Sequence, residues 1–198
     1  IVAGERSETA LAAMRDTRCK SSIDTIQSAL VGNYQPEHVF ALTQALAMYD
    51  AYQAQLELCD QQIAHSLLRL SQQNVPPREP LPKPRHRTRQ PNALNFDVRT
   101  MLYQLVGVDL TQIHGVGPYL ALRLVAECGT DLRRWPTAHH FTSWLTLAPG
   151  CRISGGKVLS AHTRKTKNRV TAHLRLAAVT VGRTNTALGA FYRRLSAR

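Results

Sequence analysis

The chain has 198 residues, of which 43% are hydrophobic, so it is long enough for one or two domains with cores of their own. Its net charge is +12. Thirteen of the 25 Lys and Arg residues follow Asp131, whereas all 13 Asp and Glu residues lie at or before it, which leaves residues 1–131 with a net charge of −1. A final third this basic is typical of a surface that binds a polyanion, most often nucleic acid, and it has no carboxylates with which to hold Mg²⁺.

The sequence has no membrane or export signal. No apolar run approaches the roughly 18 residues that a membrane-spanning helix needs, and the first residues lack the layout of a signal peptide. The four cysteines are scattered without a CxxC pair, which disfavours a structural zinc site and a disulfide framework. We therefore expect a cytoplasmic protein that does not contact a membrane. Because the numbering opens at Ile1 and not at Met, we also expect a fragment or a processed product.

Residues 1–35 are prone to form short helices, and we expect a helical connector there. Pro36 then stands at a favourable first helical position, and a heptad pattern runs over residues 36–73. We interpret this segment as a coiled-coil helix that pairs with a second copy. The alternative, an amphipathic helix that packs on its own domain, stays open. The two heptad positions are occupied by Val39, Leu46, Gln53, Asp60 and Leu67, and by Leu42, Tyr49, Leu56, Ile63 and Leu70.

Residues 74–91 form a proline-rich, basic linker. Prolines forbid a helix and favour an extended chain, so a solvated spacer is the first interpretation, and a segment that follows a nucleic-acid groove is the alternative. The prolines are Pro76, Pro77, Pro80, Pro82, Pro84 and Pro91, and the cations are Arg78, Lys83, Arg85, Arg87 and Arg89.

Residues 92–198 form a helical domain. We expect helices over 95–106, from about 109, and over 138–147, 167–181 and 185–195, so the predicted fold class is all-α or nearly so. Within this domain, residues 110–127 resemble a helix-hairpin-helix motif, with a turn at Gly115-Val116-Gly117 and Pro118 opening the second helix. Two glycines let a backbone approach closely, free amides at a helix start can bind phosphate, and Val116 would fill the core. A plain helical hairpin is the alternative.

Residues 148–163 are predicted to form a flexible, glycine-rich loop that presents Ser154. Its hydroxyl is the best candidate for a nucleophile, because nearby cations can stabilise the charge of a phosphate under attack. A loop that only binds phosphate, or only links helices, explains the same residues. The histidines lack further ligands at zinc spacing, so we expect no metal site. The candidate nucleic-acid-binding residues are Gly115, Val116, Gly117, Arg152, Lys157, Arg164, Lys165, Lys167, Arg169 and Arg175.

Motifs along nearly the whole chain resemble one family, the insertion-sequence transposases that combine a RuvC-like Asp-Glu-Asp-Asp nuclease domain with a serine-bearing transposase domain. The matching segments are 4–6 (Gly-Glu-Arg), 14–20 (Met-Arg-Asp-Thr-Arg-Cys-Lys), 32–34 (Gly-Asn-Tyr), 40–46 (Phe-Ala-Leu-Thr-Gln-Ala-Leu), 49–60 (from Tyr-Asp to Cys-Asp), 113–117 (Ile-His-Gly-Val-Gly) and 149–157 (Pro-Gly-Cys-Arg-Ile-Ser-Gly-Gly-Lys).

The resemblance implies a bacterial, nucleoid-associated DNA recombinase that is guided by a bridge RNA and assembles through its coiled coil. It implies that Ser154 attacks the DNA backbone beside Mg²⁺ held by the RuvC-like domain of another subunit. No such domain is visible in this sequence, so we expect residues 1–35 to connect to an N-terminal domain that is missing, and this chain to bind nucleic acid without cutting it. The alternative function is a non-catalytic module for nucleic-acid binding and dimerisation.

Overall fold

The computed structural model describes residues 1–75, 77–85 and 93–197. It is mostly helical, which confirms the predicted fold class, and its only strands in those ranges form one two-stranded sheet. The contacts between residues divide the chain into two units, Ile1–Cys59 and Asp60–Arg198. In the described part of the chain, no helix combines the length and the hydropathy that crossing a membrane requires.

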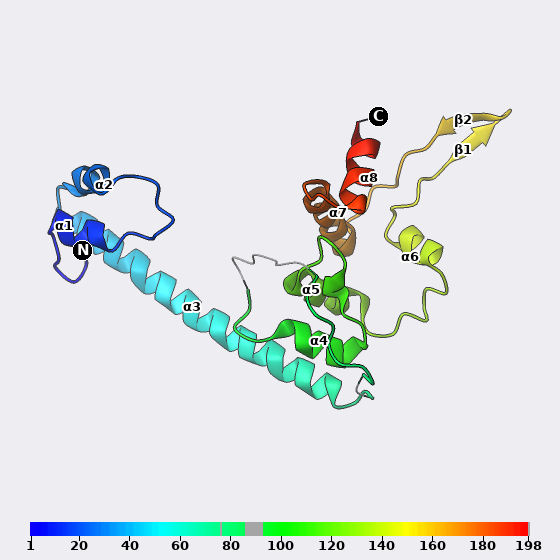
Figure 1. Cartoon of the computed structure of the whole chain (residues 1–198), viewed down its shortest axis with the longest axis horizontal. Helices are drawn as coiled ribbons and strands as arrows, with labels where there is room; N and C mark the ends of the chain where they lie inside the picture. Colours follow the sequence, from blue (N-terminus) through cyan, green and yellow to red (C-terminus); the bar gives the residue numbers. More distant parts are fainter. Residues whose placement is uncertain (76, 86–92, 198) are drawn as a thin grey trace. The chain divides into compact units, whose positions relative to one another are not determined.

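The first unit contains two short helices and most of a long one (Figure 1). Helices α1 (Glu8–Ala13) and α2 (Ile23–Leu30) pack on each other, and each begins at a serine whose hydroxyl accepts a hydrogen bond from a backbone amide of the first turn. Helix α3 (Pro36–Ser71) is continuous over 36 residues. It begins at the predicted proline and ends two residues before the predicted limit.

The second unit contains the end of α3 and all later elements. Its helices are α4 (Val98–Val106), α5 (Pro118–Cys128), α6 (Ala138–Trp144), α7 (Arg169–Gly182) and α8 (Ala187–Ser196), with a 3₁₀ turn, η1 (Leu110–Gln112), before α5. Strands β1 (Arg152–Ser154) and β2 (Lys157–Ser160) lie between α6 and α7 (Figure 1). The helices predicted over 95–106, 138–147, 167–181 and 185–195 are present as α4, α6, α7 and α8, with ends that differ by up to three residues. The helix predicted from about 109 is only the 3₁₀ turn η1.

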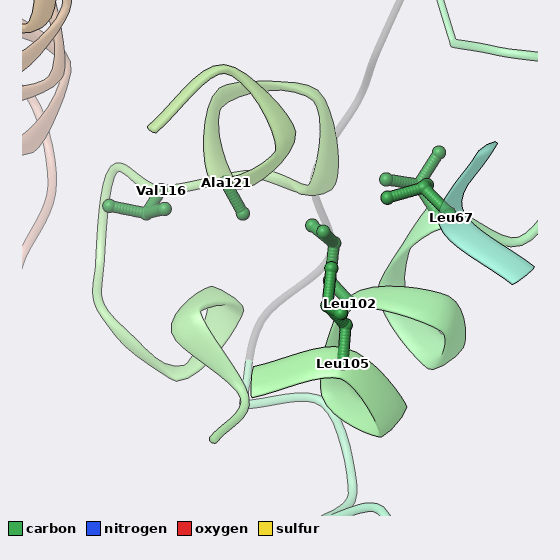
Figure 2. Close-up of a cluster of buried hydrophobic side chains, with 6 residues drawn as sticks. Leu67, Leu102, Leu105, Val116 and Ala121 are labelled. Carbon is green, nitrogen blue, oxygen red and sulfur yellow. The ribbon is translucent and has the colours of Figure 1, made fainter. Parts of the chain in front are cut away.

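The core of the second unit joins α3, α4 and α5. Figure 2 shows Leu67 of α3 and Leu102 and Leu105 of α4 beside Val116 and Ala121, which belong to the glycine turn and to α5. Ile63 also packs against this cluster. The last part of the heptad pattern therefore packs on its own domain, which was the alternative to a coiled coil for this segment. The burial of Val116, with 4% of its surface exposed, confirms its predicted place in the core.

Helices α6, α7 and α8 complete the second unit. Helix α7 packs against both α5 and α8. The buried Thr171 hydroxyl of α7 donates a hydrogen bond to the backbone oxygen of Leu145 at 2.6 Å, which ties α7 to the end of α6. Leu145 is buried, whereas Phe141 and Trp144 are only partly buried and pack with Trp135 in an aromatic cluster.

Part of the predicted linker is anchored to this unit. The Tyr103 hydroxyl donates to the backbone oxygen of Glu79 at 2.9 Å, the Arg99 guanidinium donates to that of Pro82, and the Gln112 side-chain amide donates to that of Lys83 at 3.1 Å. The segment over 79–83 forms no helix or strand, as its prolines indicate, but it is held in place and is not a free spacer. Pro76, Arg87, Arg89 and Pro91 lie outside the described residues.

Candidate nucleic-acid interface

The segment that presents Ser154 is a β-ribbon, so the prediction of a flexible loop over 148–163 was wrong. Strands β1 and β2 pair antiparallel and are joined by Gly155 and Gly156 alone. Both glycines have positive φ, +54° and +77°, which is the backbone of a type I′ hairpin turn. This turn matches the twist of the two strands, and the β-branched Ile153 and Val158 beside it favour an extended chain. Farther from the turn, the Gly150 amide donates to the backbone oxygen of His162 at 3.1 Å.

One face of this ribbon presents the candidate nucleophile together with cations. Ser154 ends β1 and is paired in register with Lys157, which begins β2, and Arg152 is paired with Ser160. Since cross-strand partners and alternate residues of a strand share a face, Arg152, Ser154 and Lys157 lie on the same face of the ribbon. All three side chains are exposed. A phosphate on this face would meet a hydroxyl and two positive charges.

The other predicted cations lie at several places in the second unit. Arg164 donates a long hydrogen bond of 3.5 Å to the backbone oxygen of Ser143, and Lys165 and Lys167 are exposed on the segment before α7. Arg169, at the start of α7, forms an ion pair of 3.2 Å with Glu127 of α5, so its charge is partly balanced within the protein. Arg175 is exposed one turn and a half further along α7.

The predicted hairpin over 110–127 consists of η1, the glycine turn and α5. Gly117 precedes α5 without a side-chain cap, and Pro118 opens the helix as predicted. Gly115 has a different environment from the one we expected. Its φ is +85°, and a Cβ atom there would lie 2.5 Å from Val181 Cγ2 and 2.9 Å from the Ala177 backbone oxygen. The structure thus explains this glycine by its close contact with α7, and a DNA contact by the hairpin stays a prediction.

A buried carboxylate holds the start of this hairpin in place. The side chain of Asp109 is 2% exposed, and it accepts hydrogen bonds from Arg99 at 2.6 Å, from the Thr111 hydroxyl at 2.6 Å and from the Gln112 amide at 2.9 Å. Burial raises the pKa of the Asp109 carboxyl, but these hydrogen bonds outweigh burial and hold that pKa well below its usual range. Arg99 and Gln112 also bind the anchored segment over 79–83, so one cluster joins it to α4 and η1.

An apolar groove lies beside the hairpin. It has a volume of about 320 Å³ and is lined by the turn at Ile113 to Val116 and by side chains of α7 and α8, among them Phe191 and Leu195.

Neither this groove, nor the cluster around Asp109, nor the β-ribbon was found by sequence reasoning. A sequence signal existed for the ribbon, because two adjacent glycines between β-branched residues are typical of a two-residue hairpin turn.

Metal-binding side chains do not gather in the part of the chain that the structure describes. Over 1–75, 77–85 and 93–197, no group of three or more His, Cys, Asp or Glu side chains lies close enough together to hold a metal ion. The residues at hand therefore do not fit the Mg²⁺ site that the family resemblance implies for a RuvC-like domain.

The region that contains this interface is similar to one family of known proteins. Residues 107–193 match the family model described as the transposase IS116/IS110/IS902 family. The match spans η1, the glycine turn, the β-ribbon and α5 to α7, and it ends within α8. Searches of curated proteins and of solved structures returned no significant match. The family match indicates a function related to DNA transposition for this region.

Proposed function

We propose that this chain acts as a DNA transposase, or as part of one, in which the β-ribbon binds the DNA backbone and Ser154 is the nucleophile for strand cleavage and exchange. The position of Ser154 is the main support. Within the region that matches the transposase family, it is an exposed serine beside the hairpin turn, on the same face as Arg152 and Lys157.

The chemistry that this position supports is a transesterification. The Ser154 hydroxyl loses its proton as its Oγ forms a bond to the phosphorus atom. The ester bond from phosphorus to a deoxyribose oxygen breaks, and the departing oxygen takes up a proton, so the step is balanced in protons. Arg152 and Lys157 stabilise the negative charge that grows on the phosphate oxygens. Attack by a deoxyribose hydroxyl of another strand reverses the reaction, joins the new strand and releases the serine. We derive no step through Mg²⁺, because the described residues do not form a site for it.

The proposed partners are DNA, a bridge-type guide RNA and a second copy of the chain. The cations of the final third would bind the phosphates of both nucleic acids, and the family resemblance suggests the RNA. Self-association would use α3, where Leu42, Leu46, Tyr49 and Leu56 of the heptad pattern are exposed. These apolar side chains are spaced for contact with another helix, whereas Leu67 is already buried in its own domain.

Substitution of Ser154 tests the catalytic role. The complete protein that the gene encodes should be assayed for strand cleavage and joining with element DNA, guide RNA and Mg²⁺ present. Ser154→Ala should lower the rate by a factor of about a thousand or more, as loss of a nucleophile generally does, with DNA affinity unchanged. Ser160→Ala is the matched control on the same ribbon and should keep activity. Undiminished strand exchange in Ser154→Ala would refute the proposal.

The alternative is a module for nucleic-acid binding and dimerisation without catalysis. The exposed cations and the exposed stripe of α3 favour it equally well, because neither depends on Ser154. It predicts the same DNA affinity and the same oligomeric state as the first proposal. The two differ only in the Ser154→Ala assay, where the alternative predicts no loss.

A further inference from the structure

The two faces of the β-ribbon differ in chemistry. Ser154, Arg152 and Lys157 occupy one face, whereas Ile153 and Val158 are paired in register and share the opposite face. Ile153 is 64% exposed and Val158 is 62% exposed. Leu159, which the register shift leaves without a cross-strand partner, is 67% exposed. Three large aliphatic side chains are therefore in water on a ribbon whose two strands have three and four residues.

An uncovered apolar ribbon of this size requires a binding partner to bury it. A two-stranded sheet with no packed face is marginal in water, and contiguous exposed apolar side chains generally mark an interaction site. The charge around the ribbon decides what kind of partner fits. Its other face and the following segment present Arg152, Lys157, Arg164, Lys165 and Lys167, and no acidic residue occurs after Asp131. This surface is complementary to a polyanion that also offers apolar surface, which is what an unstacked nucleic-acid base on its phosphate backbone provides.

The opposed faces restrict how DNA can be bound. If Ile153 and Val158 faced the bases in the groove of an intact duplex, Ser154 would point away from that duplex. If Ser154 faced the backbone of an intact duplex, the apolar pair would stay in water. Both faces are used at once only where the ribbon lies between two strands that have parted. A ribbon with side chains on both faces occupies about 10 Å, far more than the roughly 3 Å hydrogen bonds that join paired bases, so base pairs cannot persist across it.

We propose that the β-ribbon separates the strands of the DNA at the point of cleavage, with Ile153 and Val158 packed against an exposed base of one strand and Ser154 facing the phosphate of the other. The inference rests on the proposed function, since it takes Ser154 to be the residue that faces the attacked phosphate. The cost of unstacking a base is then offset by the apolar contact, as with the aliphatic wedges that other DNA-bending proteins insert between base steps. Substrates whose strands are already parted should bind more tightly than a closed duplex.

Binding to forked DNA tests the inference directly. Fluorescence anisotropy should compare the affinity of the protein for a fork with that for a blunt duplex of equal length, in a Ser154→Ala background that excludes cleavage. We expect a preference for the fork on the order of tenfold, the factor that partial burial of two aliphatic side chains contributes. In a closed duplex, 2-aminopurine placed along one strand should also brighten on binding, because its fluorescence rises when it unstacks. A closed duplex bound as tightly as the fork, with no rise in fluorescence, would overturn the inference.

Matched variants assign the effect to the apolar face. Ile153→Thr/Val158→Thr keeps the β-branched shape that strands favour and should reduce the fork preference to about twofold or less. Val179→Thr, the same change at an exposed position of α7, is the control and should leave the preference unchanged. Val158→Ile keeps an apolar side chain at this position and should keep the fork preference. It shows whether a substitution in the ribbon by itself abolishes the preference. Retention of the full preference in the double threonine variant would contradict the inference.

The remaining outcomes separate this inference from the proposed function. If the double threonine variant changes the oligomeric state in sedimentation and leaves the fork preference intact, the apolar face binds protein and the inference is wrong. If Ser154 proves to be the nucleophile but the wild-type ribbon shows no fork preference, the proposed function stands without it. If fork preference depends on Ile153 and Val158 but cleavage does not require Ser154, strand separation stands and the proposed nucleophile is wrong.

Discussion

Replacing Gly115 with alanine should destabilise the second unit by about 2–5 kcal/mol. Two costs contribute. A residue with a Cβ atom at the φ of +85° costs about 1–2 kcal/mol relative to glycine. The new methyl group would also lie 2.5 Å from Val181 Cγ2 and 2.9 Å from the Ala177 oxygen, and overpacking of this kind costs about 1–3 kcal/mol. Urea denaturation followed by circular dichroism measures the sum as a lower midpoint with an unchanged slope.

Gly107→Ala is the control that separates the two costs. Gly107 also has a positive φ, +74°, but no atom lies within 4 Å of the position that its Cβ would take. It should therefore lose only the backbone contribution of about 1–2 kcal/mol. Val181→Ala removes one clashing atom but also leaves a cavity, because Val181 is buried, so the rescue appears as a smaller cost of Val181→Ala in the Gly115→Ala background than in wild type. Equal losses at the two glycines, with no rescue, would show that Gly115 does not pack against α7 as described.

Three further predictions concern charge. Asp109→Asn should lower the free energy of unfolding by about 3 kcal/mol in urea denaturation, because it leaves the charge of Arg99 without its buried partner; a loss below about 1 kcal/mol would contradict this. The pKa of the Asp109 carboxyl is lower in the folded protein than in the unfolded chain, where it is about 3.9, so the ionised carboxylate stabilises the fold above pH 3.9 and this stabilisation is lost as the pH falls below that value. Between pH 6 and pH 3, the melting temperature should therefore fall further in wild type than in Asp109→Asn. For binding to duplex DNA, if about five cations contact phosphates, the logarithm of the affinity should fall with the logarithm of salt concentration at a slope of about −4 to −5, and a flat response would refute the polyanion interpretation.

The helices of this protein could be predicted because their signals are local. Pro36 and the heptad pattern indicate α3, and Gly117 with Pro118 indicates the start of α5. The same apolar pattern cannot say which surface buries it. A leucine at position 67 is suited both to the interface of a coiled coil and to the core of a domain. Only the folded structure shows that Leu67 packs against α4 and α5.

The candidate interface was harder to predict, because its contacts join different secondary-structure elements. Arg99 and Asp109 are ten residues apart on different elements, and nothing in either segment alone identifies the other as its partner. Gly155 and Gly156 were interpreted as a source of flexibility, although in a hairpin turn their positive φ angles fix the register of two strands. That register decides which side chains share a face with Ser154, so the chemistry of the site depended on the element that sequence reasoning missed.

The most direct test of the central claim is to isolate the covalent bond between the protein and DNA. The complete protein should be incubated with its DNA and RNA, denatured, and digested with trypsin and nuclease before mass spectrometry. Cleavage after Arg152 and Lys157 releases a peptide over 153–157 in which Ser154 is the only hydroxyl residue, so a nucleotide on this peptide locates the attachment without ambiguity. We predict a phosphodiester on that peptide, absent in Ser154→Ala. Strand cleavage with a nucleotide attached to another residue, or to none, would contradict the account.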